Sequence, residues 1–282
     1  MIRLLQIEFQ KLWKNRASKV LTITYFVLLT LISLIAAIEF DIGPIHVSIA
    51  EQGIFNFPFI WHFNTYIAAF FKIFLAVVIV SMMANEYSYG TLKQNLIDGM
   101  SKKEFVLSKF ITVVLFASIS TVFVFIVSMI LGLMYSSYTE TSIIFSQFDY
   151  LLAYFIKLVA FFSFCLFLGV LIKRSAFAIG FLFFWFMFEF ISFGVIKYAI
   201  LKFKNTDETY IDKIYDFLPL ESMSNLIVEP FTRLNFAKTI GDQVGIENIK
   251  DYSVHYSSIL IAIVWIAIFI FGSYYIVKKR DL

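Results

Sequence analysis

The chain has 282 residues, of which 60% are hydrophobic, 20% aromatic and only 15% charged. A soluble domain has about half apolar and about a quarter charged residues, and a disordered chain has low hydrophobicity. Both classes are therefore excluded as the default, and the single Cys165 leaves no disulfide framework and no cysteine metal site. We expect an all-α polytopic membrane protein.

Residues 1–19 are predicted to form an amphipathic helix at the membrane surface, because their apolar residues recur at helical spacing. These apolar residues are Ile2, Leu5, Phe9, Leu12 and Trp13. Polar and basic residues fall mostly on the opposite face, as in an interfacial helix. A simple polar tail is the alternative interpretation.

Six later segments are long and apolar enough to cross a bilayer, which takes about 20 residues. They are 20–38, 61–84, 110–134, 150–172, 176–200 and 256–277. Their apolar runs are continuous rather than alternating, which favours helices over the strands of a β-barrel. The first segment is longer than a signal-peptide core and has no small-residue cleavage site, so we expect it to be retained.

The basic residues predict the orientation of these spans. With six spans both termini share a side, and that side holds 14 of the 23 Lys and Arg residues. The opposite loops 39–60 and 135–149 hold none, and 201–256 has six basic residues diluted by nine acidic ones. The positive-inside rule therefore places both termini in the cytoplasm, and we expect a bacterial inner membrane.

The cytoplasmic loop 85–105 carries clear helix punctuation. Gly99 is a natural helix stop, and residues 101–104 (Ser-Lys-Lys-Glu) form a capping box that starts the next helix. Before the stop, one helical face is predicted to contain Leu92, Leu96 and Ile97. The loop is therefore predicted to hold a short helix, a sharp break and the start of the third span.

The segment 201–255 is the only sizeable extracytoplasmic stretch. We expect short helices that rest on or dip into the outer leaflet. Pro219 suits the first turn of one such helix. Its apolar positions are predicted to be Leu220, Met223, Leu226 and Ile227.

Two charges are predicted near the middle of the bilayer, Lys72 in the second span and Glu189 in the fifth. A charge at that depth costs at least about 2.5–3.5 kcal/mol, so it normally faces the bundle or a cavity. They either pair with each other or line a conduit at a dimer interface; alternatively, Lys72 extends outward from a tilted helix. Lys157 and Lys197 lie nearer the outer ends, where outward extension is favoured.

No motif for nucleotide binding, zinc hydrolysis or paired-carboxylate catalysis is present. The three histidines are isolated near predicted membrane boundaries, where a structural role is more common than metal binding; they are His46, His62 and His255. The basic residues lie where the positive-inside rule already places them. We therefore predict no catalytic residues, no metal, no cofactor and no nucleic-acid partner.

The order of motifs resembles the permease subunits of type-2 ABC transporters. That family has a Glu after the second span, then Gly-Thr-Leu, then a Ser with basic residues, then a Lys. These positions are occupied here by Glu86, Gly90-Thr91-Leu92, Ser101-Lys102-Lys103 and Lys109, and Leu218-Pro219 matches a Leu-Pro step common after the fifth span. The match is partial, because Gly99-Met100-Ser101-Lys102 stands where the family often has Pro-x-Ser-Arg.

The resemblance implies that residues 1–282 form one permease domain of an ATP-driven exporter. It implies a dimer with a second copy or a paralogue, and a separate ATP-binding subunit that hydrolyses ATP, so the chain itself is not an enzyme. The loop after the second span would dock into the ATPase as a coupling helix, through Glu86, Gly90, Thr91, Leu92 and Lys93.

The resemblance does not assign a substrate, and three other interpretations stay open. The chain could relay ATPase motion to an envelope or motility machine without transporting a solute. The loop 85–105 could simply link two spans. A membrane enzyme is the remaining class, and the missing acid–base residues argue against it.

Overall fold

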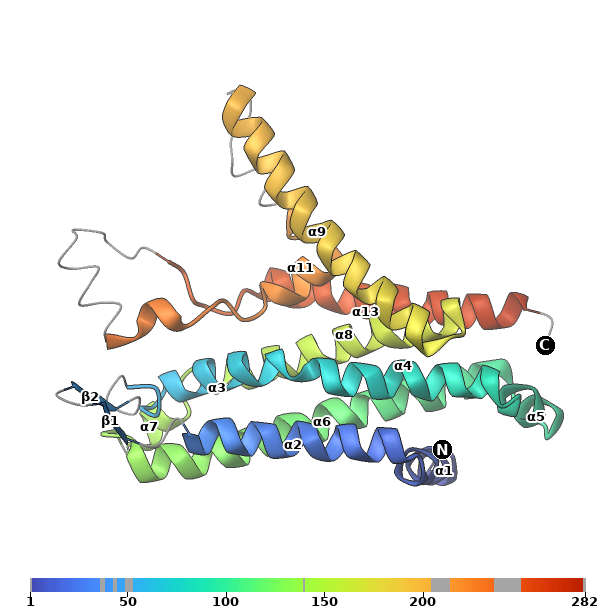
Figure 1. Cartoon of the computed structure of the whole chain (residues 1–282), viewed down its shortest axis with the longest axis horizontal. Helices are drawn as coiled ribbons and strands as arrows, with labels where there is room; N and C mark the ends of the chain where they lie inside the picture. Colours follow the sequence, from blue (N-terminus) through green and yellow to red (C-terminus); the bar gives the residue numbers. More distant parts are fainter. Residues whose placement is uncertain are drawn as a thin grey trace.

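The computed structural model describes residues 2–35, 39–42, 45–48, 53–138, 140–203, 214–235 and 250–280. Within these ranges almost all of the chain is helical, which confirms the expected helical class. Most long helices run side by side along one axis, with both termini toward one end of the bundle (Figure 1).

The helices and strands follow one another in a simple order. They are α1 (Ile2–Lys14), α2 (Arg16–Ile35), β1 (Glu39–Ile42), β2 (Ile45–Ser48), α3 (Phe59–Phe70), α4 (Lys72–Ser88), α5 (Thr91–Ile97), α6 (Lys102–Tyr135), α7 (Thr141–Ile144), α8 (Asp149–Ile172), α9 (Ser175–Phe203), α11 (Pro219–Ser224), the 3-10 helix η2 (Phe231–Arg233) and α13 (Tyr256–Lys279).

Four helical segments are long and apolar enough to cross a membrane: Lys102–Tyr135, Thr141–Ile172, Ser175–Ala199 and Tyr256–Lys279. The bent pair α3 and α4 adds a fifth if the two helices form one span. A chain with this many spanning segments is a membrane protein.

The segment that the sequence predicts as one continuous span, 61–84, is two helices that meet at an angle of 45°. At the junction the N–H of Phe71 donates to the carbonyl of Ala68, and the N–H of Phe74 donates to that of Phe71, both at 3.1 Å. These bonds reach back three residues instead of four, so the helix tightens and changes direction there. The sequence has no Pro or Gly at this point to signal the break.

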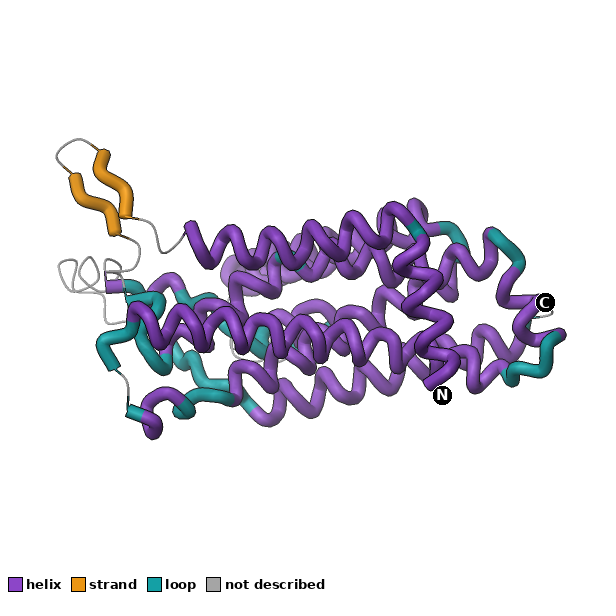
Figure 2. Tube along the Cα trace, turned by 90° about the horizontal axis from the view of Figure 1, so that it is seen from below, coloured by secondary structure: helices purple, strands orange, loops and turns teal. Residues whose placement is uncertain are grey.

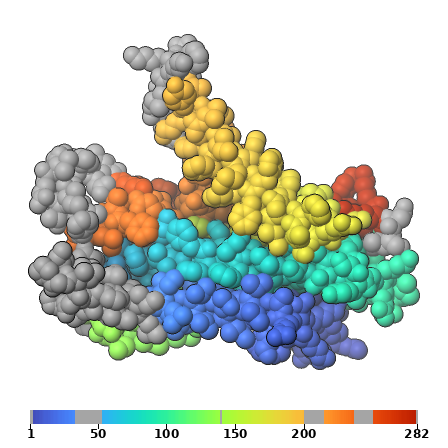
Figure 3. All heavy atoms as spheres, viewed as in Figure 1, coloured from blue at the N-terminus to red at the C-terminus, as the bar shows by residue number. Residues whose placement is uncertain are grey.

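Helix α8 lies at the centre of the bundle and contacts α3, α4, α6, α9 and α13. Of its spanning segment 72% is buried, compared with 11% for α9. Helix α9 packs against α8 and α4 but diverges from the bundle axis toward its C-terminal end (Figures 1 and 3). It is apolar on nearly every side, so most of its surface suits lipid or another subunit.

Helix α1 lies across the end of the bundle, seen end-on in Figure 1 and from the side in Figure 2. Its predicted apolar face is divided between two environments. Phe9 stacks on Phe116 of α6 at 5.8 Å between ring centroids, and Leu12 is buried. Trp13 is 59% exposed. Part of this face therefore packs on protein, and Trp13 is free to contact the membrane surface.

A two-stranded antiparallel hairpin interrupts the helical order and was not predicted. Strand β1 pairs with β2 in a register that joins Phe40 to Val47 and Ile42 to Ile45. Apolar and polar residues alternate through 39–42 and 45–48, which is a strand signal, but the sequence analysis assigned no secondary structure to this loop. The hairpin lies at the end of the bundle opposite α1 (Figure 2).

The segment after α9 packs on protein where it is described. Helix α11 begins with Pro219 in its first turn, as predicted. It contacts α8, α9 and α13, and Met223, Leu226 and Ile227 are buried. These apolar residues therefore face the bundle instead of resting on the outer leaflet. The rest of the predicted loop, 204–213 and 236–249, lies outside the described residues.

Candidate functional site

Three helices meet in a buried ion cluster at the end of the bundle where α1 and α5 lie. The ammonium of Lys109 on α6 is 2.6 Å from Glu8 Oε2 on α1 and 2.6 Å from Glu86 Oε1 on α4. Lys11 adds a second cation 2.9 Å from Glu86 Oε1. The side chains of Lys109, Glu8 and Glu86 are all buried.

The charges in this cluster balance, with two carboxylates and two ammonium groups. Burying a charge away from water is costly unless it is paired and hydrogen-bonded. Each carboxylate of the cluster meets an ammonium, and Lys109 joins both carboxylates at short range. Removing one partner of such a pair typically costs about 3–5 kcal/mol, because it leaves an uncompensated buried charge.

The same cluster holds the start of α5. The hydroxyl of Thr91 donates to Glu86 Oε2 at 2.5 Å, so one carboxylate bridges α6 and α5. Gly90 has a φ of +68° and lets the chain turn sharply from α4 into α5. Leu92 is 2% exposed and packs into the core, whereas Lys93 faces solvent.

The C-terminal end of α5 is followed by the predicted break at Gly99 and the predicted capping box. Gly99 has a φ of +96°. The hydroxyl of Ser101 accepts the N–H of Glu104 at 3.1 Å, and the Glu104 carboxylate accepts the N–H of Ser101 at 2.9 Å. This confirms the capping box at the start of α6. Lys102 donates to the carbonyls of Lys278 and Arg280, which connects this turn to the end of α13.

The five predicted docking residues lie close together but have different roles. Glu86 and Leu92 are buried, Gly90 shapes the backbone and Thr91 is bonded to Glu86, so these four hold α5 in place. Lys93 and Gly90 are exposed, and of these two only Lys93 has a side chain to offer a partner.

The predicted apolar face of α5 needs one correction, because Ile97 is 75% exposed while Leu92 is buried. Lys93 and Ile97 are one turn apart and form the outward face of α5. Helix α5 is only seven residues long and ends at Ile97, just before the break at Gly99, so this last residue does not pack against the bundle.

Glu8 and Lys11 were missed by the sequence reading, although one signal was available. Glu8 falls among Leu5, Phe9 and Leu12 on the apolar face of the predicted N-terminal helix. A carboxylate on an apolar face requires a buried partner. Lys109, already singled out by the family resemblance, is that partner.

Lys72 and Glu189 are not paired with each other, which corrects the pairing hypothesis; the alternative of a conduit at a dimer interface stays a prediction. Glu189 accepts the indole N–H of Trp185 at 2.5 Å and the backbone N–H groups of Leu220 and Glu221 at 3.2 and 2.9 Å. It thus satisfies the first free N–H groups of α11. Lys72 instead lies 4.5 Å from the ring centroid of Phe161.

The negative charge of Glu189 is felt by its neighbour on α11. Burial raises the pKa of Glu221, and the carboxylates of Glu189 and Asp216 raise it further. Glu221 therefore holds its proton to a higher pH than a free glutamate, which reduces charge repulsion at the base of α11.

Lys157 does not extend outward, contrary to prediction. Lys157 is only 4% exposed, and its ammonium donates to the carbonyl of Ser224 at 3.3 Å. The α11 segment covers it from outside the bundle, so the position along α8 alone could not reveal its burial. Lys197 lies 5.4 Å from the ring centroid of Phe193.

His62 has structural partners on every side. Its ring stacks on Tyr150 with centroids 4.3 Å apart, and its two nitrogens lie 2.7 Å from the carbonyl of Val228 and 3.0 Å from the guanidinium of Arg233. Among the described residues no group of three or more His, Cys, Asp or Glu side chains could hold a metal ion.

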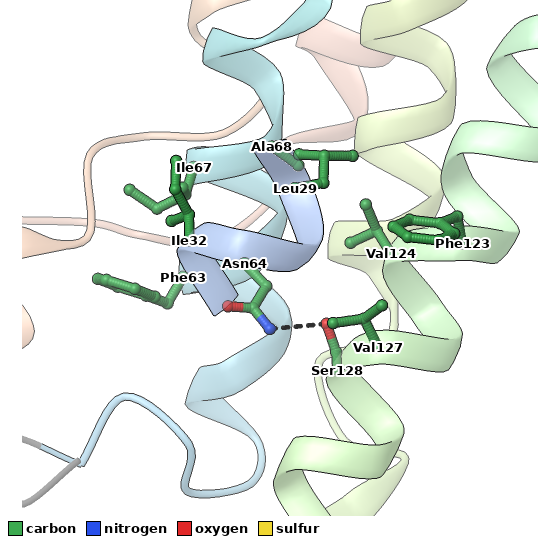
Figure 4. Close-up of a pocket in the computed structure, with 10 residues that line it drawn as sticks. All are labelled: Leu29, Ile32, Phe63, Asn64, Ile67, Ala68, Phe123, Val124, Val127 and Ser128. Carbon is green, nitrogen blue, oxygen red and sulfur yellow. Dashed lines mark hydrogen bonds between the residues drawn. The ribbon is translucent and has the colours of Figure 1, made fainter. Parts of the chain in front are cut away.

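A small cavity between α2, α3 and α6 has a volume of about 30 Å³, enough for about one water molecule. Asn64 donates to the hydroxyl of Ser128 at 2.9 Å at its edge (Figure 4). The remaining lining is mostly apolar, and the hydrogen bond joins α3 to α6. We assign this cavity a packing role.

The fold and these buried charges define a helical membrane protein with a short, firmly anchored helix at one end. A family model described as a protein of unknown function, DUF2705, matches residues 47–282. The chain belongs to this family. None of the curated proteins matches it.

Proposed function

We propose that the chain is the permease subunit of an ATP-driven exporter that couples to a separate ATP-binding subunit. One observation carries the proposal: the ion cluster of Glu8, Glu86, Lys109 and Lys11 joins α5 to α1, α4 and α6. A force applied to the outward face of α5 would therefore reach three helices through buried, charge-assisted contacts.

The proposed membrane layout has six spans, which are α2, the α3–α4 pair, α6, α8, α9 and α13. A helix lies over each of the six apolar segments of the sequence. Helices α1 and α5 and the end of α13 lie at one end of the bundle (Figure 1). The excess of Lys and Arg in 1–19, 93–109 and 278–280 supports a cytoplasmic location for that end.

The docking surface of this proposal is the exposed face of α5, Lys93 and Ile97. Protein interfaces combine an apolar centre with a polar rim, and Ile97, which is 75% exposed, would supply the apolar contact beside Lys93. Residues beneath this face are buried and bonded, so α5 is a preformed element. A preformed helix loses little conformational entropy when a partner binds it.

The test is co-purification of the full chain, carrying an affinity tag, from its own cells. The expected result is a stable partner with Walker A and Walker B motifs, identified by mass spectrometry. The double variant Lys93→Glu/Ile97→Asp should lose the partner while the chain stays folded, because both side chains are exposed.

The matched control is Lys14→Glu, an exposed lysine at the same end of the molecule, which should keep the partner. Recovery of no ATPase with the unchanged chain would overturn the proposal. Recovery of an ATPase that drives no solute movement in vesicles would favour the non-transporting alternative, a relay of motion to another machine.

A further inference from the structure

A cavity of about 510 Å³ lies where α3, α4, α8, α9 and α11 meet. It is within the usual size range of small-molecule sites, about 300–1,000 Å³. The bend between α3 and α4 and the divergence of α9 create the space; the base of α9 rises from the α4 surface in Figure 3. Phe183 and Phe186 of α9 line it and are 54% and 51% exposed, so this wall continues onto the outer surface.

Two lysines line this cavity, Lys72 from α4 and Lys157 from α8. Both are neighbours of Phe161, since Lys157 precedes that residue by one helical turn and Lys72 lies over its ring. Neither ammonium forms an ion pair with a carboxylate among the described residues. Glu221 influences Lys157 electrostatically but is not bonded to it, and Glu189 is occupied by Trp185 and α11.

The present partners of the two lysine side chains would compensate a positive charge only weakly. Lys72 contacts an aromatic face and Lys157 a single carbonyl at 3.3 Å, and both contacts are weaker than a bond to an anion. Two like charges within the spans are costly, because water cannot screen them there. An anion in the cavity would remove this cost.

Apart from Tyr66 and Ser224, the rest of the cavity wall is apolar. It includes Phe161, Leu182, Phe183, Phe186 and Met223. Such a surface suits alkyl chains or rings. A ligand that satisfies both parts of the wall needs an acidic group and an apolar body.

We propose that this cavity binds an amphiphile with an anionic head group, with the head between Lys72 and Lys157 and the apolar part along α9. The idea that this ligand is the transported substrate rests on the proposed exporter function. Binding itself does not require the ATPase, so the two ideas can fail separately.

The experiment measures equilibrium binding of fluorescently labelled phosphatidylglycerol to the full chain in neutral detergent. Labelled phosphatidylcholine with the same acyl chains tests the contribution of the head-group charge. Inorganic phosphate, added as a competitor, tests whether an anion without an apolar body can occupy the site. The double variant Lys72→Gln/Lys157→Gln should weaken phosphatidylglycerol binding at least about tenfold and leave phosphatidylcholine binding unchanged. The matched control, Lys103→Gln/Lys197→Gln, removes the same charge away from the cavity and should bind normally.

Two further variants keep the result interpretable if the double glutamine variant folds poorly. Lys72→Arg/Lys157→Arg retains both charges and should retain binding. Ala69→Phe fills the cavity beside Lys72 without altering a charge and should weaken binding. Equal binding of the two lipids, or equal losses in the cavity and control variants, would overturn the proposal. Displacement by inorganic phosphate alone would also overturn it, by showing a site for a soluble anion.

Discussion

Lys109 of α6 and Glu86 of α4 form a buried ion pair 2.6 Å long, and Thr91 at the start of α5 bonds to the second oxygen of the same carboxylate. One glutamate therefore fixes the position of α5 relative to two long helices. This relationship gives a mechanical reason for a Glu before Gly-Thr-Leu and a Lys further along. The Lys must be long enough to reach across from the next span, and the Thr must supply a donor.

Replacing Lys109 with Met should destabilise the chain strongly, because Glu8 and Glu86 would be left buried without this cation. We expect a loss of about 3–5 kcal/mol in the free energy of unfolding. Denaturant unfolding in a fixed detergent measures it. Lys103→Met, an exposed change six residues earlier, should stay within about 0.5 kcal/mol of the parent. Similar unfolding of the two variants would show that the cluster contributes little.

Thr91→Val should loosen α5 without unfolding the bundle. Valine has nearly the same shape but cannot donate to Glu86, and a hydrogen bond to a charged group contributes about 1.5–3 kcal/mol. Amide hydrogen exchange of residues 91–97 should accelerate, while exchange in α8 stays slow. Lys93→Gln on the exposed face of the same helix is the control and should leave exchange unchanged. No acceleration in the Thr91 variant would show that other contacts hold α5.

Gly90→Ala tests the sharp turn between α4 and α5. The φ of +68° is unfavourable for a residue with a Cβ, and no atom lies within 4 Å of the added carbon. The expected cost is therefore conformational, about 1–2 kcal/mol. Gly180→Ala in α9 also meets open space but in helical backbone, and should be neutral or stabilise by up to about 1 kcal/mol. Changes of opposite sign in the free energy of unfolding of the two variants would confirm that the backbone conformation decides the effect. Equal changes would contradict it.

Much of the helical layout follows from the sequence because apolar periodicity and caps are local signals. The stop at Gly99, the capping box of Ser101 and Glu104, and Pro219 at the start of α11 were all predicted. In each case the residue that decides the backbone lies within four positions of the feature. The bend at Phe71 was missed because no residue there has an unusual backbone preference.

The partners of buried charges were harder to predict, since they depend on contacts between distant parts of the chain. A pair of Glu189 with Lys72 was one of the hypotheses left open, but Glu189 lies against the first turn of α11, about 30 positions further along. Lys157 was expected near solvent, but α11 covers it. Sequence gives the depth of such a charge and not the direction in which its helix faces. Packing decides that direction.

Glu189→Gln tests the anchoring of α11. Glu189 accepts three hydrogen bonds through two oxygens, whereas glutamine offers one oxygen and an NH₂ group that repels one of the donors. We expect faster amide exchange in residues 219–224 and altered tryptophan fluorescence from Trp185. Glu140→Gln, an exposed residue, is the control and should change neither signal. Unchanged exchange in α11 would show that apolar packing alone holds it.

Differences in local packing give a graded prediction for three glycines, which lie on α8, α13 and α9. A Cβ at Gly169 would lie 2.8 Å from the Cβ of Met83, an atom that moves only with its helix. A Cβ at Gly272 would meet the ring edge of Phe167 at 2.9 Å, and a ring can turn aside. A Cβ at Gly194 would meet nothing within 4 Å.

Alanine at these positions should therefore destabilise in the order Gly169, Gly272, Gly194. The free energy of unfolding of the Gly169→Ala variant should fall by about 1–3 kcal/mol, which is the usual cost of overpacking. Gly194→Ala should be neutral or slightly stabilising, because alanine is the better helix former. Unfolding of all three in the same detergent measures the order. A Gly169 variant as stable as the Gly194 variant would mean that α4 and α8 separate freely, which the central, largely buried position of α8 argues against.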